Sequence, residues 1–334
     1  MKLLISQYTS FLFFLLAVAM LLSACSNDEP NETPAPSDDR SEIRVKADVS
    51  TMTEGTRATL FATGALTSGS FTCAVYNANT TTTFISPTAV NWVTDHWEFS
   101  DGKHYWPASG SLDFFAYIMP FPAPSYITSS LAYSSPRSAQ FTCANLPMTF
   151  SSDNATAGQG SDLQEFVYAL VTDQNKAGQG TSGVTLNFKH PFARIKFQLS
   201  ANHPDIKINS ITFEGLKTGG ICTFDGTNST WTNLTPADGT VDFVVTLKGD
   251  AVNFNTHASS TPTPIGVDYL MIPQAFAGNI TVNATWTDWG EEFAHNVSTT
   301  LPPITWQAGN NYTYTFTISE YDLRVDTSKY TEQW

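Results

Sequence analysis

The chain has 334 residues, enough for two domains of ordinary size or one large β domain. Only 14% of the residues are charged, whereas 41% are hydrophobic and 13% aromatic, a composition that excludes a disordered chain and a coiled coil. The 16 Lys and Arg residues face 30 Asp and Glu residues, giving a net charge of -14. This excess of acid excludes nucleic acid as a partner, because phosphates would repel the chain.

Residues 1 to 24 have the organisation of a secretory signal peptide. Lys2 is followed by an apolar run over residues 11 to 22, too short to span a bilayer as a helix, and by small residues before Cys25. The sequence Leu-Ser-Ala-Cys at residues 22 to 25 resembles a bacterial lipobox. That resemblance implies lipidation of Cys25, and attachment of the precursor to the outer membrane through several acyl chains.

Residues 25 to 40 are polar and rich in proline, with no apolar periodicity, and therefore predict a flexible linker. The acidic pair Asp28-Glu29 resembles the surface-export signal of Bacteroides-type lipoproteins. A merely solvated linker explains the same pair.

The segment after the linker predicts a one-sided β-strand. Its apolar residues alternate with Arg44, Lys46 and Asp48, so that one face holds Ile43, Val45, Ala47 and Val49. A polar loop over residues 51 to 59 follows; it contains a glycine and one arginine, Arg57, and is the kind of loop that proteases cut.

Most of the remaining chain predicts short strands with period-two alternation, separated by Gly, Asn, Pro and Asp. Clear examples are residues 71 to 75, 195 to 199 and 312 to 318. Residues 112 to 119 are apolar on both faces, which predicts a central strand covered on both sides. Residues 162 to 171 suit a helix or a strand equally well.

These patterns predict an all-β protein with two tandem β-sandwich domains. The most glycine-dense polar stretch in the middle of the chain, residues 174 to 183, places the boundary between an N-terminal domain over residues 41 to 178 and a C-terminal domain over residues 179 to 334. Near the C-terminus, Tyr321, Leu323 and Val325 alternate with polar residues. They are either inserted side chains of a donor strand or part of an edge strand of the second domain.

The sequence offers no catalytic, cofactor-binding or metal-binding motif. Its six histidines form no ligand pair, and Glu291-Glu292 would point to opposite faces of a strand. With Cys25 assigned to lipid, Cys73, Cys143 and Cys222 remain; Cys73 and Cys143 lie in one expected domain and could form a disulfide, although buried free thiols are favoured over it. We therefore expect no enzymatic activity and no cofactor.

Four stretches in order resemble the fimbrillin-like (Mfa-like) family, whose members are subunits or relatives of type V pili. The first combines a tryptophan, a Tyr-Trp-Pro sequence and an aromatic run, and the others are similar to the family's F-K-H strand, its Y-L-I-P-Q sequence and its W-x-x-G-x-x-Y-x-Y sequence. They are residues 97 to 120, 186 to 195, 269 to 274 and 306 to 314. The aromatic residues in them and His190 are expected to serve the core rather than a ligand site.

The resemblance implies transthyretin-like sandwiches and assembly by strand exchange at the cell surface, in a fimbrium. In this mechanism an arginine-specific surface protease removes the first strand, and a strand from another pilin subunit fills the groove. Arg57-Ala58 resembles the family's T-R-A processing motif, so the displaced strand would carry Ile43, Val45, Ala47 and Val49. A host or bacterial surface receptor is a further partner that the resemblance suggests.

Two other functions compete with this one. A glycan-binding surface lipoprotein that keeps its lipid could use exposed aromatic residues such as Trp286 and Trp289 as a stacking platform, although these two would face opposite sides of a regular strand. An exported hydrolase would need a cleft with a perturbed carboxylate or histidine.

Overall fold

The computed structural model describes residues 41–49, 64–65, 69–119, 123, 125–128, 131–134, 137–153, 166–179, 182–201, 207–248, 262–288, 291–319 and 322–333. Residues 42 to 334 belong to one unit. Almost all regular structure in the described part is β-strand, so the all-β prediction is confirmed. A short helix, α2 (Lys176–Gln179), is the exception. None of the described helical residues forms a segment long and apolar enough to cross a membrane.

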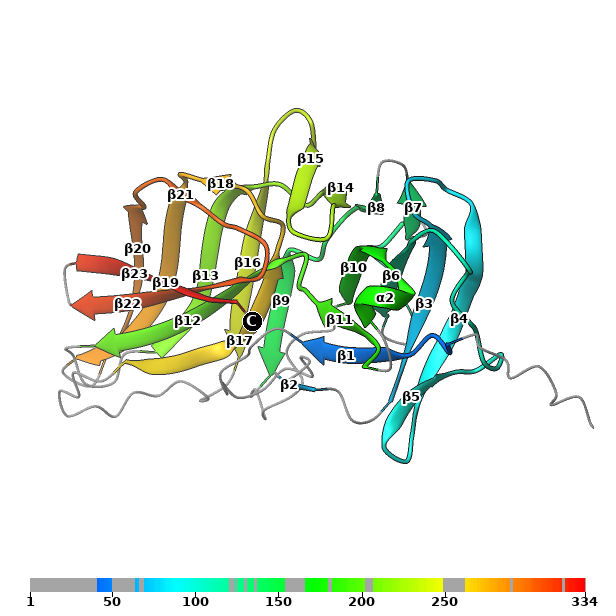
Figure 1. Ribbon diagram of the computed structural model, residues 1–334. Helices are drawn as coiled ribbons and strands as arrows, with labels where there is room; N and C mark the ends of the chain where they lie inside the picture. Colours follow the sequence, from blue (N-terminus) through cyan, green and yellow to red (C-terminus); the bar gives the residue numbers. More distant parts are fainter. Residues whose placement is uncertain are drawn as a thin grey trace, which may run out of the picture. The chain divides into compact units, whose positions relative to one another are not determined.

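Two sheets face each other in the part of the chain nearest the N-terminus (Figure 1). One has the strand order β11-β1-β2 and the other the order β10-β6-β3-β4-β5. The strands of the first sheet are β11 (Val184–Phe188), β1 (Val45–Val49) and β2 (Gly64–Ala65). The strands of the second sheet are β10 (Val167–Gln174), β6 (Leu112–Ile118), β3 (Ser70–Asn77), β4 (Thr83–Val93) and β5 (His96–Phe99).

Two further sheets enclose a second hydrophobic core, which is built from their inward-facing side chains. Their strand orders are β17-β12-β22-β23 and β20-β19-β13-β16-β9. The strands are β17 (Thr263–Met271), β12 (Ala193–Ala201), β22 (Asn310–Ser319) and β23 (Asp322–Gln333), and β20 (Glu291–Thr300), β19 (Asn279–Asp288), β13 (Lys207–Leu216), β16 (Val241–Lys248) and β9 (Thr149–Asp153).

A third core cluster lies between these two and is covered by a sheet of order β15-β14-β8-β7. That sheet contains β15 (Ser229–Thr235), β14 (Gly219–Phe224), β8 (Ser138–Cys143) and β7 (Ala132–Ser134). The short strands β18 (Ala275–Phe276) and β21 (Ile304–Thr305) pair with each other.

Strand β6 is a central strand with both faces covered, as its sequence predicted. Phe114 and Ala116 lie in the first cluster, whereas Phe115 lies in the third. Its neighbour β10 alternates in the same way, with Val167 and Ala169 on one side and Tyr168 and Leu170 on the other. Within the range 162 to 171, residues 167 to 171 are therefore strand rather than helix, because only a strand sends successive side chains to two different cores, and residues 162 to 165 lie outside the described residues.

The boundary expected between residues 178 and 179 stays a prediction. The strands do not keep to the two sides of it: β11 pairs with β1, and β8 pairs with β14. Strand β9 pairs with β16. Core-forming strands from both sides of that position thus share sheets.

Candidate functional site

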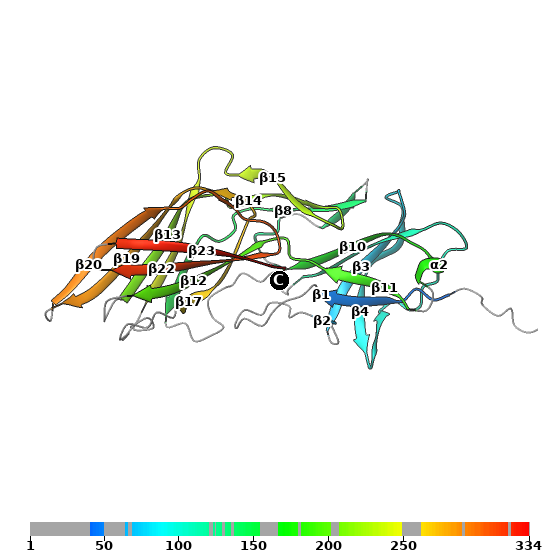
Figure 2. The same ribbon diagram turned by 60° about the vertical axis from the view of Figure 1, so that its left-hand side comes forward.

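The first strand lies between two partners. Strand β1 runs parallel to β11, with register pairs from Val45↔Val184 to Val49↔Phe188, and antiparallel to β2 through Asp48↔Ala65 and Val49↔Gly64. Figures 1 and 2 both show β1, in blue, beside β11, in green. Since β2 has only two residues, the long contact of β1 is with β11.

The segment that follows β5 holds the start of this strand. The backbone N–H of Ile43 donates to the carbonyl of His104 at 2.8 Å, and Glu42 forms an antiparallel bridge with Tyr105. The Glu42 carboxylate also lies 3.4 Å from Arg44 and 3.6 Å from Lys103. Both cationic side chains are largely exposed, so these ion pairs contribute little, and the backbone bonds fix the position.

The inner face of the strand is part of the core. Ile43, Val45 and Ala47 are 3 to 4% exposed and pack in one cluster with Trp106 and Phe188. Burying Ile43 and Val45 contributes about 1.5–3 kcal/mol each as an upper estimate. Removal of β1 would therefore open an apolar groove and leave the facing edge of β11 without backbone partners.

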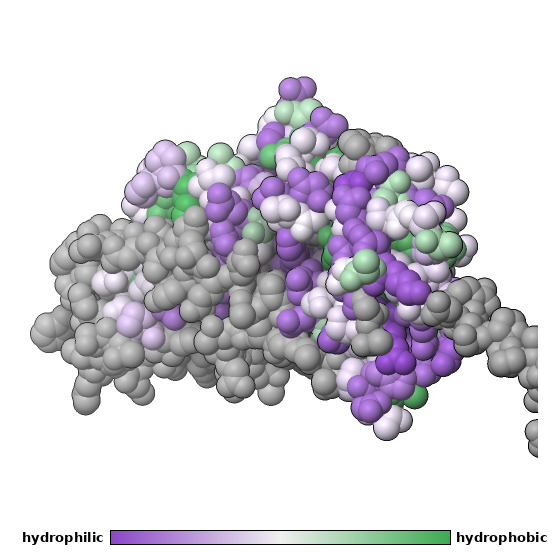
Figure 3. All heavy atoms as spheres, viewed as in Figure 1, coloured by the Kyte–Doolittle hydropathy of each residue, from purple (hydrophilic) through white to green (hydrophobic). Residues whose placement is uncertain are grey.

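The outer face is polar, because Arg44 and Lys46 are exposed. Among the described residues, the large hydrophobic side chains that are exposed are Phe84, Val93 and Val241. Figure 3 shows mostly hydrophilic residues on the described surface of one face, with scattered hydrophobic ones. The apolar side chains beside β11 are thus covered by β1.

Gly183 allows β1 and β11 to approach closely. It has a φ of +82°, and a Cβ there would lie 3.0 Å from the carbonyl oxygen of Arg44. The next residue, Val184, donates its backbone N–H to that same oxygen at 2.8 Å. A side chain at position 183 would therefore strain the turn and press on the backbone of the first strand.

We expect Gly183→Ala to destabilise the uncut protein more than Gly110→Ala does. Gly110 has a φ of +92°, and a methyl group at that position would have nothing within 4 Å, so its substitution carries only the backbone strain of about 1–2 kcal/mol. At Gly183 overpacking adds about 1–3 kcal/mol. Chemical denaturation measures both variants with β1 present and after its removal. The difference in unfolding free energy between the two variants should vanish once β1 is removed. A difference of the same size with and without β1 would contradict the contact between Gly183 and the backbone of Arg44.

The described residues offer no metal centre, and their cysteines are not reactive thiols. No group of three or more His, Cys, Asp or Glu residues within the described ranges could hold a metal ion. Cys73, Cys143 and Cys222 are free and buried, so Cys73 and Cys143 form no disulfide. Burial raises the pKa of all three thiols, that of Cys143 to about 12, which keeps them protonated and unreactive at neutral pH.

The family model described as fimbrillin-like matches residues 44–334, a range that begins within the segment of the first strand. The chain belongs to the fimbrillin-like family. Among curated proteins, none matches the sequence significantly.

Three solved structures resemble this fimbrillin-like chain. A fimbrial protein from Bacteroides vulgatus has a TM-score of 0.56 and 15% identity, covering 88% of this chain and 99% of that one. A candidate cell adhesion protein from Bacteroides ovatus has a TM-score of 0.47 and 13% identity, covering 88% and 96%. Another from Bacteroides uniformis has a TM-score of 0.45 and 15% identity, covering 88% and 98%. The first of these supports the same fold.

The stretches that resemble the family have structural roles in the fimbrillin-like chain. Residues 186 to 188 end β11, the long neighbour of β1, and Tyr105 bridges to Glu42. Gln274 is buried and bonds Lys217 through both its amide atoms, while Trp306 donates its Nε1–H to the hydroxyl of Tyr314 at 2.8 Å. His190 is buried as well.

Several sequence-predicted site residues lie outside the described residues: Cys25, Arg57, Ala58 and Tyr321, together with Trp289. In the register of β1 and β11, Val49 lies opposite Phe188. In the register of β23 and β22, Leu323 lies opposite Ile318 and Val325 lies opposite Phe316. Strand β23 is an edge strand of the sheet β17-β12-β22-β23. Trp286 lies in β19.

Sequence reasoning missed the residues that hold the first strand from outside it. Lys103 and His104 precede the Tyr-Trp-Pro sequence without any pattern of their own, and Gly183 belonged to the glycine-dense stretch that was used to place the domain boundary. A glycine directly before a buried strand is a signal of close backbone approach, and could have indicated the contact.

Proposed function

We propose that this fimbrillin-like chain is a fimbrial subunit that is exported as a lipoprotein and assembled by strand exchange after its first strand is removed. The observation that carries the proposal is the position of β1 and the residues just before it, because Ile43, Val45 and Ala47 fill the core beside the edge of β11. A strand that leaves such a groove offers both apolar contacts and unpaired backbone groups to another strand.

The proposed cleavage point lies in the segment that links β1 to β2. Arg57-Ala58 stands between Val49, the last residue of β1, and Gly64, the first residue of β2. A cut there would leave β1 bound to the rest of the subunit by non-covalent contacts alone. Release of β1 would then also separate the subunit from the lipid on Cys25. An arginine-specific surface protease is the proposed partner for this step.

The proposed donor is the C-terminal strand of another copy. Residues 322 to 328 read D-L-R-V-D-T-S and residues 42 to 48 read E-I-R-V-K-A-D, so an acid, an aliphatic residue, an arginine and a valine recur in the same order, whereas the next positions, Asp326 and Lys46, differ in charge. In this register Leu323 would take the place of Ile43, and Val325 that of Val45. The groove already accepts these shapes, which favours a second copy of the chain as donor.

Within its own subunit β23 occupies a position from which it could leave. It pairs on one side with β22, and no sheet neighbour lies on its other side in the described strand order. Detachment of an edge strand breaks one ladder rather than two.

The proposal has three further parts. The precursor is anchored in the outer membrane before cleavage, the cleaved subunit lies in a surface fimbrium, and the fimbrium adheres to a host or bacterial surface receptor. Support comes from membership of the fimbrillin-like family and from the lipobox-like residues before Cys25. The function needs no catalysis or cofactor.

N-terminal sequencing of protein sheared from intact cells tests the proposal. We expect chains that start at Ala58, and we expect Arg57→Ala to abolish them. Arg40→Ala is the matched control, because Arg40 precedes the first strand and its loss should change nothing. Two results would contradict strand removal. One is that all chains start at Cys25, and the other is that they start at Ser41, because such chains would have lost the lipid but kept β1.

A further inference from the structure

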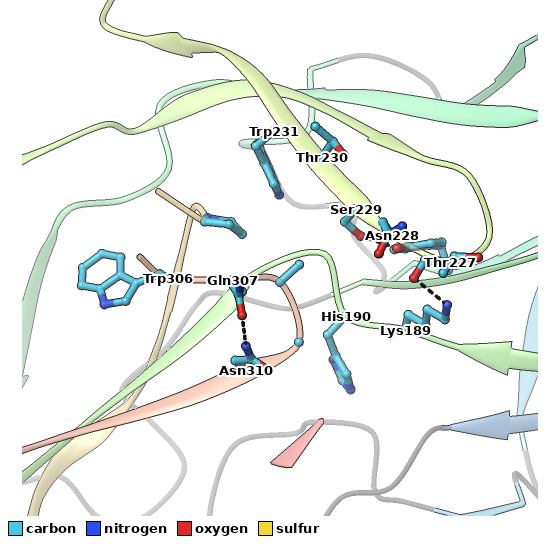
Figure 4. Close-up of a pocket in the computed structure, with 14 residues that line it drawn as sticks. Lys189, His190, Thr227, Asn228, Ser229, Thr230, Trp231, Trp306, Gln307 and Asn310 are labelled. Atoms are coloured by element: carbon cyan, nitrogen blue, oxygen red, sulfur yellow. Dashed lines mark hydrogen bonds between the residues drawn. The ribbon is translucent and has the colours of Figure 1, made fainter. Parts of the chain in front are cut away.

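A cavity of about 460 Å³ opens between segments that lie far apart in the sequence. Its walls are Lys189 and His190, the turn and strand over residues 227 to 231, and the turn over residues 306 to 310, with Tyr168 and Pro273 completing it. Figure 4 shows these residues around a central space, with Trp231 on one side and Gln307 and Asn310 across from it. The volume lies within the range of small-molecule binding sites.

One wall is fixed by hydrogen bonds that leave its side chains facing the opening. The Asp225 carboxylate accepts the backbone N–H groups of Thr227 and Asn228 at 2.9 and 2.8 Å, and these bonds lower the pKa of Asp225. The Lys189 ammonium donates to the carbonyls of Gly226 and Thr227 at 2.6 and 3.0 Å. The turn between β14 and β15 is thus held from both sides.

The opposite wall is held in the same manner. The N–H of Gly309 donates to the carbonyl of Phe192 at 2.8 Å, and Gln307 donates its N–H to the hydroxyl of Tyr312 at 2.9 Å. Asn310 donates from its side-chain amide to that of Gln307 at 3.0 Å. A ligand that enters between two ordered walls loses little affinity to the ordering of protein segments.

The lining combines many uncharged polar groups with aromatic side chains, of which Tyr168, His190 and Trp306 are buried and Trp231 is partly exposed. Hydroxyl groups come from Thr227, Ser229 and Thr230, and amides from the side chains of Asn228, Gln307 and Asn310. Trp231 is held by a bond from its Nε1–H to the carbonyl of Pro191 at 2.8 Å and by contact with Phe192, with ring centroids 5.4 Å apart. None of the 14 lining residues is Asp or Glu.

We propose that this cavity binds a saccharide unit of a glycan. Hydroxyl and amide groups that both donate and accept match the hydroxyl groups of a sugar, and an immobilised indole beside them can contact its C–H face. A nucleotide is a poorer match, because its phosphates would meet one cation in a chain of net charge -14. The site is separate from the β1 groove, so it adds ligand binding to an assembling subunit.

Saturation-transfer NMR and calorimetry with the full-length protein test the site. The probes are free glucose, galactose, mannose, N-acetylglucosamine, glucuronic acid and N-acetylneuraminic acid. We expect at least one to bind, and we expect Asn228→Ala and Gln307→Ala each to weaken that binding about fivefold or more, because each removes amide groups that would bond the sugar. Selective binding of the two acidic sugars would assign a role to Lys189.

Asn296→Ala is the matched control, since Asn296 is an exposed amide on β20 that does not line the cavity. It should bind the same sugar unchanged. All three variants should remain folded and be processed at Arg57 like the parent protein, and Asn228→Ala, which leaves the bond between Asn310 and Gln307 intact, should weaken binding without a change in melting temperature. Absence of binding to every sugar in the panel, or equal binding by all variants, would overturn the proposal without affecting strand exchange.

Discussion

Val45→Asp is expected to lower the free energy of unfolding of the uncut protein by about 3 kcal/mol or more and to leave the cut protein unchanged. Val45 is 4% exposed and lies in the core cluster that the two facing sheets share. A carboxylate at that position would be buried among apolar side chains without a partner. After cleavage and release of β1 the substituted residue is no longer part of the subunit.

Lys46→Asp provides the control, because it introduces the same residue on the exposed face of the same strand. Its effect on unfolding should stay within about 0.5 kcal/mol. Thermal or urea denaturation of parent and variants, each with and without residues 25 to 57, gives the four comparisons. Equal losses from Val45→Asp in both forms would show that the segment is not a removable part of the core.

Val325→Asp is expected to abolish polymerisation while the monomer remains folded. In the proposed register Val325 of one copy replaces Val45 of the next, so its carboxylate would enter the same apolar groove. Within its own subunit it belongs to β23, which has one sheet neighbour and whose loss leaves the other strands of that sheet paired. Sedimentation and electron microscopy of cleaved protein follow assembly, and a melting curve follows the fold.

Arg324→Asp is the matched control, since Arg324 corresponds to the exposed Arg44 and would point away from the groove. This variant should polymerise. Normal polymers from Val325→Asp would mean that another segment acts as donor. A monomer that loses its fold would instead show that β23 is required by its own sheet.

The strand pattern of the chain could be predicted from sequence wherever alternation was strong. Residues 43 to 49, 71 to 75, 195 to 199 and 312 to 318 all lie in or next to strands, because a half-buried strand needs one apolar side chain in two. The pairing could not be predicted in this way. Nothing near Val45 indicates that its neighbour is Val184, since the hydrogen bonds of a sheet join backbones regardless of side chain.

No sequence pattern indicated the saccharide cavity. Its walls come from segments far apart in the sequence, and the residues of its two turns, such as Asn228 and Gly309, are ordinary turn residues in sequence. The tryptophans considered as a glycan platform were Trp286 and Trp289, whereas the tryptophans that line the cavity are Trp231 and Trp306. A cavity depends on which turns the sheets bring together, and single-segment patterns do not encode that.

The groove beside β11, which β1 fills, has a consequence for any polymer of this chain. If a strand of another copy replaces β1, each link joins two unlike surfaces, the donor strand of one copy and the groove of the next, and links that do not close into a ring form a filament. Every link then has the same polarity. Such a filament grows without a built-in limit, and its two tips differ: one has a groove still awaiting an occupant, and the other has a terminal strand that no neighbour has accepted.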